Sequence, residues 1–343
     1  MKISFAIFAH NEEENIPDLL LDLSKQDILL DSDIDVRFVL LANGCTDDTV
    51  AAARSALSTL PPEFSAHVEV LDLVESGKSR TAHRFIHEFS RPDDDLLGFM
   101  DGDIRIPMPT ALRDMSTELY DRSNLVVITS HPIKDINFGA SSKGFIPRLI
   151  GSGADSLTDW KKSICGQLFL ARTGALRRIG LPIGLPVEDG FFRAMLLTGL
   201  FSHPEDLNLI DGHQDVFHVY SSIKTLPELV RHQTRIVIGS AINSAIYQKV
   251  RNEAVNESEA HDMLMKAAVD EEWIPTLIRQ ELPRLPFGYI PFEFLSNRWR
   301  RYIQRKKFGA KPTLNLFLGT GLDLTVWILA SYKMHRGTGA GHW

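Results

Sequence analysis

Two aspartates stand directly behind a short apolar run in the stretch LLGFMDGDIRIP, residues 96–107. Only one glycine separates Asp101 from Asp103, so a tight turn would hold two mutually repelling carboxylates close together. A hard divalent cation relieves such repulsion through oxygen ligation, and Mg²⁺ or Mn²⁺ bridging to a diphosphate is the occupant we expect. The alternative is a structural turn that binds nothing.

The same Asp-x-Asp spacing occurs at three other places in the chain, so the spacing alone is weak evidence for a binding site. Asp31/Asp33, Asp33/Asp35 and Asp93/Asp95 all precede predicted strands and read as solvated turns. Asp101/Asp103 alone follows a predicted strand, so its position rather than its spacing makes it a candidate site.

A second acidic pair, Glu188-Asp189, follows the segment GLPIGLPV and opens an apolar helix. Acidic residues at a helix N-terminus are favourable by themselves, which is the simplest explanation. The functional interpretation is a general base, because a carboxylate in a partly apolar pocket beside a diphosphate can accept the proton of an attacking hydroxyl.

The segments that must position these carboxylates alternate between two periodicities. Apolar runs at residues 3–9, 36–42, 68–73 and 96–100 predict strands, and helices are expected at 12–25, from Asp47, from about Ser79, and at 109–121. Continuous apolar strands alternating with helices predict a mainly parallel sheet covered on both faces, hence a Rossmann-like α/β domain. From residue 224 the chain is predicted to be mostly helical, including segments near 291–307 and 314–332.

Each predicted strand ends in polar residues. In open α/β sheets ligands bind outside the carboxyl ends of the strands, so these endings should meet at one edge. The coincidence of several such endings is what predicts a ligand site there. They are His10-Asn11-Glu12, Asn43 to Asp47, Asp72 to Lys78, and Asp101 to Asp103.

The distribution of charge and the number of cysteines bear on the cellular location of the protein. The net charge is -7, yet residues from 281 onward carry ten Lys and Arg against three Asp and Glu. Two cysteines, Cys45 and Cys165, form no disulfide framework, and the acidic residues near the start argue against a signal peptide, so we expect a cytoplasmic protein. The basic segment NRWRRYIQRKKFGAKP beside the apolar segment 314–332 predicts contact with an anionic membrane face or, equally well, a solvated helix followed by a docking helix.

The order of motifs resembles that of the family 2 glycosyltransferases, whose fold is called GT-A. The resemblance covers about residues 3–240. The matching segments are FAHNEEENI, LLANGCTDDT, ESGKSRTAHRFI, FMDGDIRI, CGQLFLARTGALRRIG and LPVEDGFF.

That resemblance implies transfer of a sugar, with inversion, from a nucleotide-diphosphate sugar to an acceptor hydroxyl, with Mg²⁺ or Mn²⁺ as cofactor. Asn11, Glu12 and Asn43 would line the base and ribose pocket, Lys78 would serve nucleotide-sugar binding, and Asp101 would contact ribose or metal-bound water. Asp103 would ligate the cation and Asp189 would be the base, with Glu188 orienting it or the acceptor.

Several positions depart from the family pattern or stay open. Ala42 replaces an aspartate common at the end of strand two, which leaves the nucleotide preference open; a UDP-sugar is the expected donor. The segment HQTRI keeps only Arg235 of the motif of processive members, which favours a single addition; Arg235 contacts diphosphate or is a surface cation. His218 is either a third metal ligand or a buried strand histidine.

We therefore predict a catalytic domain at residues 1–240, divided into a nucleotide-binding half (1–130) and an acceptor half (131–240), followed by a helical region at 241–343 that is a candidate for membrane contact. Residues 131–162 are expected to form an active-site loop or an insertion. The acceptor is a glycan, a lipid-linked molecule or a small molecule, and no nucleic-acid partner is expected. Two alternative functions for the whole protein stay open: a sugar-phosphate nucleotidyltransferase, and a degenerate sugar-nucleotide-binding or scaffolding protein.

Overall fold

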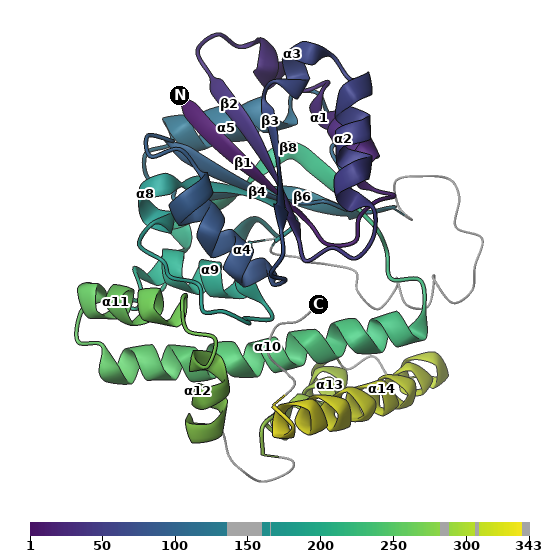
Figure 1. The fold of residues 1–343 in the computed structure, drawn as a ribbon. Coiled ribbons are helices and arrows are strands. Elements are labelled where there is room, and N and C mark those ends of the chain that lie inside the picture. Colours follow the sequence, from purple (N-terminus) through teal and green to yellow (C-terminus); the bar gives the residue numbers. More distant parts are fainter. Residues whose placement is uncertain (136–159, 165, 282–287, 306–308, 338–343) are drawn as a thin grey trace.

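The computed structural model describes residues 1–135, 160–164, 166–281, 288–305 and 309–337 (Figure 1). A twisted sheet with helices on its faces forms the upper part, and a long helix crosses beneath it. Most of the predicted active-site loop at 131–162, together with Cys165, Lys306 and Lys307, lies outside the described residues.

The sheet has eight strands in the order β3-β2-β1-β4-β7-β6-β8-β5. The first four predicted strands are confirmed to within one residue or so at each end, and β1 pairs in parallel with both β2 and β4. The strand bounds are β1 Lys2–Ala9, β2 Asp35–Asn43, β3 Val68–Leu73, β4 Leu96–Asp101, β5 Ile104–Arg105, β6 Val127–Lys134, β7 Leu168–Arg172 and β8 Ile210–Tyr220.

The sheet is mixed rather than purely parallel. Strand β7 runs antiparallel to both of its neighbours, β4 and β6, and β5 runs antiparallel to β8. A continuous apolar run predicts a strand buried on both faces but not its direction, since direction depends on the connection that precedes it.

Helices cover both faces of the sheet and extend below it. The α-helix bounds are α1 Ile16–Leu23, α2 Thr49–Thr59, α3 Pro62–Ser65, α4 Lys78–Arg84, α5 Ala111–Asp121, α8 Thr173–Leu176, α9 Glu188–Thr198, α10 Leu226–Glu253, α11 Glu257–Ala267, α12 Trp273–Glu281, α13 Glu293–Arg305 and α14 Ala310–His335.

The central strands are apolar on both faces because both faces are covered. Along β1, Phe5 and Ile7 pack into one core cluster, whereas Ala6 and Phe8 pack into the other. On β4 the Phe99 ring stacks on Phe169 of β7, with ring centroids 4.7 Å apart. These two layers pack against both faces of the strands that lead to the edge where the polar residues collect.

The long helix α10 joins the sheet domain to the C-terminal helices. It begins with a capping box in which the Glu228 N–H donates to Thr225 Oγ1 at 3.3 Å, and it packs against α12 and α14. The predicted domain boundary at residue 240 falls inside this continuous helix, so it is not a linker; the division into domains stays a prediction.

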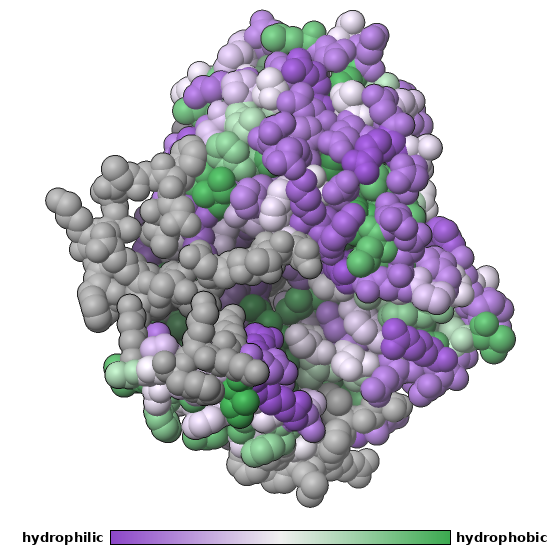
Figure 2. All heavy atoms as spheres, turned by 180° about the vertical axis from the view of Figure 1, so that it is seen from behind, coloured by the Kyte–Doolittle hydropathy of each residue, from purple (hydrophilic) through white to green (hydrophobic). Residues whose placement is uncertain are grey.

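Two features of hydropathy concern the surface of the α/β part and the C-terminal helix α14. On the face seen from behind, hydrophilic residues dominate the upper, α/β part (Figure 2). Among the described residues, one helical segment, Pro312–His335 within α14, is long and apolar enough to cross a membrane, judged by length and composition.

Candidate active site

The carboxyl ends of the parallel strands place the candidate residues at one edge of the sheet. Phe8 of β1 lies beside Asp101 at the end of β4, and Ala9 lies beside Ala42 near the end of β2. Gly102 makes the turn after β4, donating its N–H to the Phe8 carbonyl at 2.8 Å. A Cβ at Gly102 would lie 3.0 Å from that same oxygen, so a larger residue would push Asp101 and Asp103 away from the edge.

Lys78 connects the two acidic pairs. Its Nζ lies 2.6 Å from Asp101 Oδ1 and 2.8 Å from Glu188 Oε1, and the residue is only 8% exposed. The ammonium also lies 5.7 Å from the centre of the Phe8 ring. Lys78 is the first residue of α4, and Gly77 before it has φ +126°, a conformation that favours glycine. A buried lysine thus joins the Asp101 turn to the start of α9.

The charges in this cluster shift one another. Burial would lower the pKa of Lys78, but the adjacent carboxylates of Asp101 and Glu188 outweigh it and raise that pKa. Burial raises the pKa of Asp101 to about 6, against the opposing pull of Lys78. For Glu188 burial acts the same way, yet the Lys78 ammonium prevails and the pKa of Glu188 is lowered. Glu188 therefore stays ionised, whereas Asp101 binds a proton more readily than an ordinary aspartate.

Asp103 and Glu12 extend the acidic cluster toward solvent. Burial raises the pKa of Asp103. Burial likewise raises the pKa of Glu12 to about 7, and the charges of Asp103, Asp101 and Asp47 add to the shift although Asn15 Nδ2 donates to its carboxylate at 2.7 Å. Several acids with raised pKa values at one edge carry more negative charge than Lys78 balances, and a bound cation would balance the remainder.

Glu12→Gln is expected to flatten the pH dependence of stability between about pH 4.5 and 7. In that window the folded protein holds the Glu12 proton more tightly than the unfolded chain, whose ordinary pKa is 4.5, so the free energy of unfolding falls as pH rises. Urea unfolding at a series of pH values measures this slope. Glu14→Gln, an exposed neighbour, is the control, and parallel curves for wild type and Glu12→Gln would contradict the prediction.

Asp189 is the second residue of α9, where it faces the loop before β7. Its Oδ1 accepts the N–H of Gly190 at 2.7 Å, and a Cβ at Gly166 would lie 3.2 Å from Asp189 Cβ. Burial and the negative charge of Glu188 raise the pKa of Asp189. Glu188 and Asp189 therefore differ: Glu188 is held as an anion by Lys78, whereas Asp189 has a raised proton affinity, as a general base requires.

Helix α10 supports the start of α9 from below. Asn243 Nδ2 donates to the Val187 carbonyl at 3.0 Å, and the Tyr247 hydroxyl donates to the Gly190 carbonyl at 3.0 Å. The positive charge of Arg235, also on α10, reaches the acidic pair: it adds to the lowering of the pKa of Glu188 by Lys78 and opposes, without reversing, the raised pKa of Asp189. Sequence reasoning named Arg235 but missed Asn243 and Tyr247, because nothing local to them indicates which backbone they contact.

The two asparagines predicted for the nucleotide pocket hold strand ends together. Asn43 donates from Nδ2 to the Ala9 carbonyl at 2.9 Å and accepts the Gly77 N–H at 3.2 Å, so both ends of its amide are engaged. Asn11 has φ +59°, and its Oδ1 accepts the Thr46 N–H at 2.8 Å. Both lie at the predicted edge, and their contact with a nucleotide stays a prediction.

Both ring nitrogens of His218 contact other side chains, and its role as a cation ligand stays a prediction. His218 is fully buried in β8, with Nδ1 against Ser130 Oγ and Nε2 3.0 Å from Gln167 Oε1. Burial lowers the pKa of His218 to about 3, so the ring is neutral. Both nitrogens are engaged, and within the described ranges no group of three His, Cys, Asp or Glu side chains is arranged to hold a metal. A cation here would rest on the aspartates and on its substrate.

Comparison with solved structures identifies the architecture. A mannosyltransferase from Pyrobaculum calidifontis, solved with GDP-Man and Mn²⁺, superposes with a TM-score of 0.52 at 14% identity, covering 97% of this chain and 86% of its own. Glucosyl-3-phosphoglycerate synthase from Mycobacterium tuberculosis, solved with Mn²⁺, UDP-glucose and phosphoglyceric acid, has a TM-score of 0.47 at 20% identity, covering 70% and 77%. At 14% identity, the similarity to the mannosyltransferase shows only a shared fold, the GT-A fold.

Comparison of the sequence identifies the family. No curated protein matches it. The family model described as glycosyl transferase family 2 matches residues 4–180, more than half of the 343 residues, and this range contains the strand ends, Lys78 and the Asp101/Asp103 turn. The chain therefore belongs to glycosyl transferase family 2 and is a glycosyltransferase with the GT-A fold.

Proposed function

We propose that this enzyme transfers a sugar from a nucleotide-diphosphate sugar, with UDP as the nucleotide, to an acceptor hydroxyl, with inversion and with a divalent cation. One observation carries the proposal: Lys78 joins the Asp101/Asp103 turn to Glu188 at 2.6 and 2.8 Å. That contact brings a candidate diphosphate anchor into one site with Glu188, the neighbour of the candidate base Asp189.

The residues present fit a divalent cation. Asp101 and Asp103 stand on one turn at the ligand edge, and burial raises the pKa of each, which is the strain that oxygen ligation of Mg²⁺ or Mn²⁺ would relieve. Such ions are commonly held by one or two carboxylates plus substrate phosphates. Asp103 would be the direct ligand, Asp101 would contact ribose or a water, and the bound ion would supply positive charge to the departing diphosphate.

The chemistry is assigned to the start of α9. Asp189 would accept the proton of the acceptor hydroxyl as its oxygen bonds to the anomeric carbon and the bond to the diphosphate breaks. The raised pKa of Asp189 supports this role, and Glu188, kept anionic by Lys78, would orient the acceptor. With the base and the leaving group on opposite faces of the sugar, the anomeric configuration inverts.

The cationic groups suit the leaving group. Lys78 and Arg235 would face the diphosphate, and Asn11, Glu12 and Asn43 lie where the base and ribose would bind. The two solved relatives were crystallised with a UDP-sugar and a GDP-sugar respectively, so the nucleotide is a proposal of its own. The decayed HQTRI segment supports a single addition over a processive polymer.

The cellular location, the acceptor and an association with the membrane are also proposals. A cytoplasmic location is supported by two cysteines that form no disulfide framework, and the acceptor would be a glycan, a lipid-linked molecule or a small molecule. Association with the inner membrane face is supported by the positive charge that accumulates after residue 281.

Nucleotide binding tests the anchor. Isothermal titration of UDP, GDP and dTDP, each with Mn²⁺ and with a chelator, is expected to show Mn²⁺-dependent binding that Asp103→Asn abolishes. Asp33→Asn, in an exposed Asp-x-Asp pair, is the matched control and should bind normally. If the wild-type protein binds none of the three nucleotides in Mn²⁺, the proposal is wrong.

A further inference from the structure

Helix α14 carries apolar side chains on the face that points away from the protein. Phe317 and Leu318 are 60% and 56% exposed. With 3.6 residues per turn, the exposed apolar positions fall in one stripe roughly 120° wide. They are Leu314, Phe317, Leu318, Leu324, Ile328 and Tyr332. A soluble helix normally places charged residues on this face, so α14 presents a surface that water does not favour.

The opposite face of α14 is already packed. Leu316, Val326, Ala330 and Met334 are buried, and α14 lies along α10. A helix held along its length by α10 cannot cross a bilayer without leaving that packing. The exposed stripe is therefore suited to lying in the plane of an interface.

The one acidic residue inside α14 is neutralised within the protein. Asp323 accepts two hydrogen bonds from Arg298 of α13, at 2.6 and 2.7 Å. Gly319 leaves the space, because a Cβ there would lie 2.5 Å from Arg298 Nη1. This bidentate pair fastens α13 to α14 and removes the charge that would oppose contact between the stripe and an apolar phase.

Helix α13 extends the same surface and adds positive charge. The Trp299 ring lies edge-on to Phe317 with centroids 5.7 Å apart, and Ile303 one turn on is 61% exposed. Arg300 and Arg301 are exposed on the same helix. From residue 281 onward the chain carries ten Lys and Arg against three Asp and Glu, whereas its overall charge is -7. An apolar surface bordered by cations is complementary to an anionic lipid surface.

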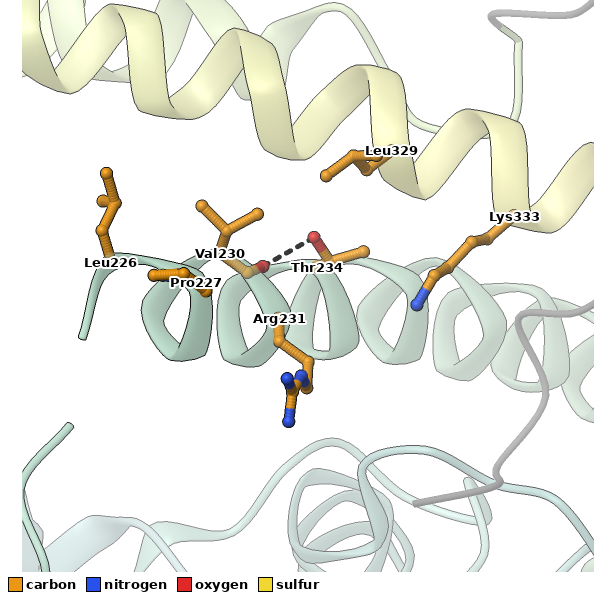
Figure 3. Close-up of a pocket in the computed structure, with 7 residues that line it drawn as sticks. All are labelled: Leu226, Pro227, Val230, Arg231, Thr234, Leu329 and Lys333. Atoms are coloured by element: carbon orange, nitrogen blue, oxygen red, sulfur yellow. Dashed lines mark hydrogen bonds between the residues drawn. The ribbon is translucent and has the colours of Figure 1, made fainter. Parts of the chain in front are cut away.

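A pocket of about 420 Å³ lies between α10 and α14 (Figure 3). Leu226, Val230 and Thr234 line it from α10, and Leu329 and Lys333 point into it from α14. Arg231 also lines the pocket from α10. The lining is mostly apolar with a cation at one end, which fits a segment of lipid chain below an anionic headgroup.

We propose that the exposed faces of α13 and α14, here called the docking face, bind the surface of an anionic lipid bilayer, and that the α10–α14 pocket receives part of one lipid. The docking face is defined by Trp299, Ile303, Leu314, Phe317, Leu318, Leu324, Ile328 and Tyr332, flanked by Arg300 and Arg301. This binding does not depend on the transferase chemistry.

Vesicle co-sedimentation of the full chain tests the docking face. The protein is expected to sediment with vesicles of phosphatidylcholine and phosphatidylglycerol and to stay in solution with phosphatidylcholine alone. The variant Phe317→Ser/Leu318→Ser/Ile328→Ser should bind about tenfold more weakly or worse, because it loses apolar area that would be buried in the interface. Arg300→Glu/Arg301→Glu should lose the preference for anionic lipid and bind several-fold more weakly.

The matched control is Leu30→Ser/Val74→Ser/Val255→Ser, which removes exposed apolar residues elsewhere and should bind like wild type. Vesicles with brominated acyl chains should quench Trp299 fluorescence, and Trp299→Phe should remove that part of the quenching; adsorption by charge alone would not quench it. Circular dichroism and the melting temperature show that each variant folds, since all of these side chains are exposed.

Three results would overturn the proposal. The wild-type protein could stay in solution with anionic vesicles, or the control variant could lose as much binding as the docking-face variant. Sedimentation equilibrium could instead reveal a dimer that the docking-face variant dissociates, without vesicle binding, and the face would then be an interface between two copies. Because none of these readouts requires catalysis, failure here is distinguishable from failure of the proposed transferase reaction.

Discussion

Asp189→Asn is expected to lower kcat by about 10²- to 10⁴-fold, the usual contribution of a general base. The substitution preserves size, and the amide oxygen can still accept the Gly190 N–H that Asp189 Oδ1 accepts at 2.7 Å. What disappears is the ability to take up a proton. Binding of the nucleotide with Mn²⁺ should be unchanged, because the anchor at Asp101 and Asp103 is untouched.

The measurement needs no knowledge of the acceptor. Water entering the site should be activated by the same base, so slow hydrolysis of the sugar nucleotide can be followed as release of the nucleoside diphosphate. Asp262→Asn, an exposed position on α11, is the control and should hydrolyse at the wild-type rate. If Asp189→Asn retains more than about a tenth of the rate, the base lies elsewhere.

Lys78→Met is expected to lower the free energy of unfolding by about 3–5 kcal/mol, the usual cost of removing one partner from a buried ion pair. In the unmutated protein the carboxylates of Asp101 and Glu188 lie 2.6 and 2.8 Å from the Lys78 ammonium. The substitution removes this cation and leaves the two buried carboxylates without a partner. Nucleotide binding should be lost as well, since the same group holds the acidic turn in place.

The loss has a pH signature. Without Lys78 the pKa of Glu188 rises above its value in the unfolded chain, and the already raised pKa of Asp101 rises further, so the deficit is largest at neutral pH and shrinks as acid protonates both carboxylates. Lys78→Met/Glu188→Gln should recover part of the stability, because only one buried carboxylate remains without a partner.

Lys249→Met provides the comparison, since Lys249 pairs with Glu253 one turn along α10. Pairs of that kind contribute about 0.3–0.5 kcal/mol, so this variant should unfold at nearly the wild-type denaturant concentration. Equal stability of Lys78→Met and wild type in urea would show that the buried pair does not hold the two halves of the site together.

The sequence alone located the first half of the fold well because the signals there are local. Strands β1 to β4 are apolar runs bounded by polar residues, and their bounds follow from that pattern. Their polar ends meet at one edge because parallel strands share a direction. The pattern of residues therefore suffices to place Asp101, Asp103, Asn11, Glu12 and Asn43 together.

The exposed stripe of α14 shows a limit of the same reasoning. Its residues form an apolar segment that sequence analysis found, but which face is covered depends on how α10 packs. Asp323 puts a charge in the middle of this apolar segment, and only its bidentate pairing with Arg298 in the folded protein neutralises that charge. The sequence also left open whether His218 is a metal ligand or a buried strand histidine, and only the structure shows that its ring nitrogens contact Ser130 and Gln167.

What the sequence determined by itself is the family, the order of the strands along the chain and the edge at which the polar residues gather, because each depends on short-range patterns. What only the tertiary structure decided is the charge arrangement of the site. Lys78, Asp101 and Glu188 come from three separate segments, and the strong interaction of their charges requires burial together at contact distance. Asp189 owes its raised pKa to that burial and to Glu188 beside it, which no spacing in the chain could reveal.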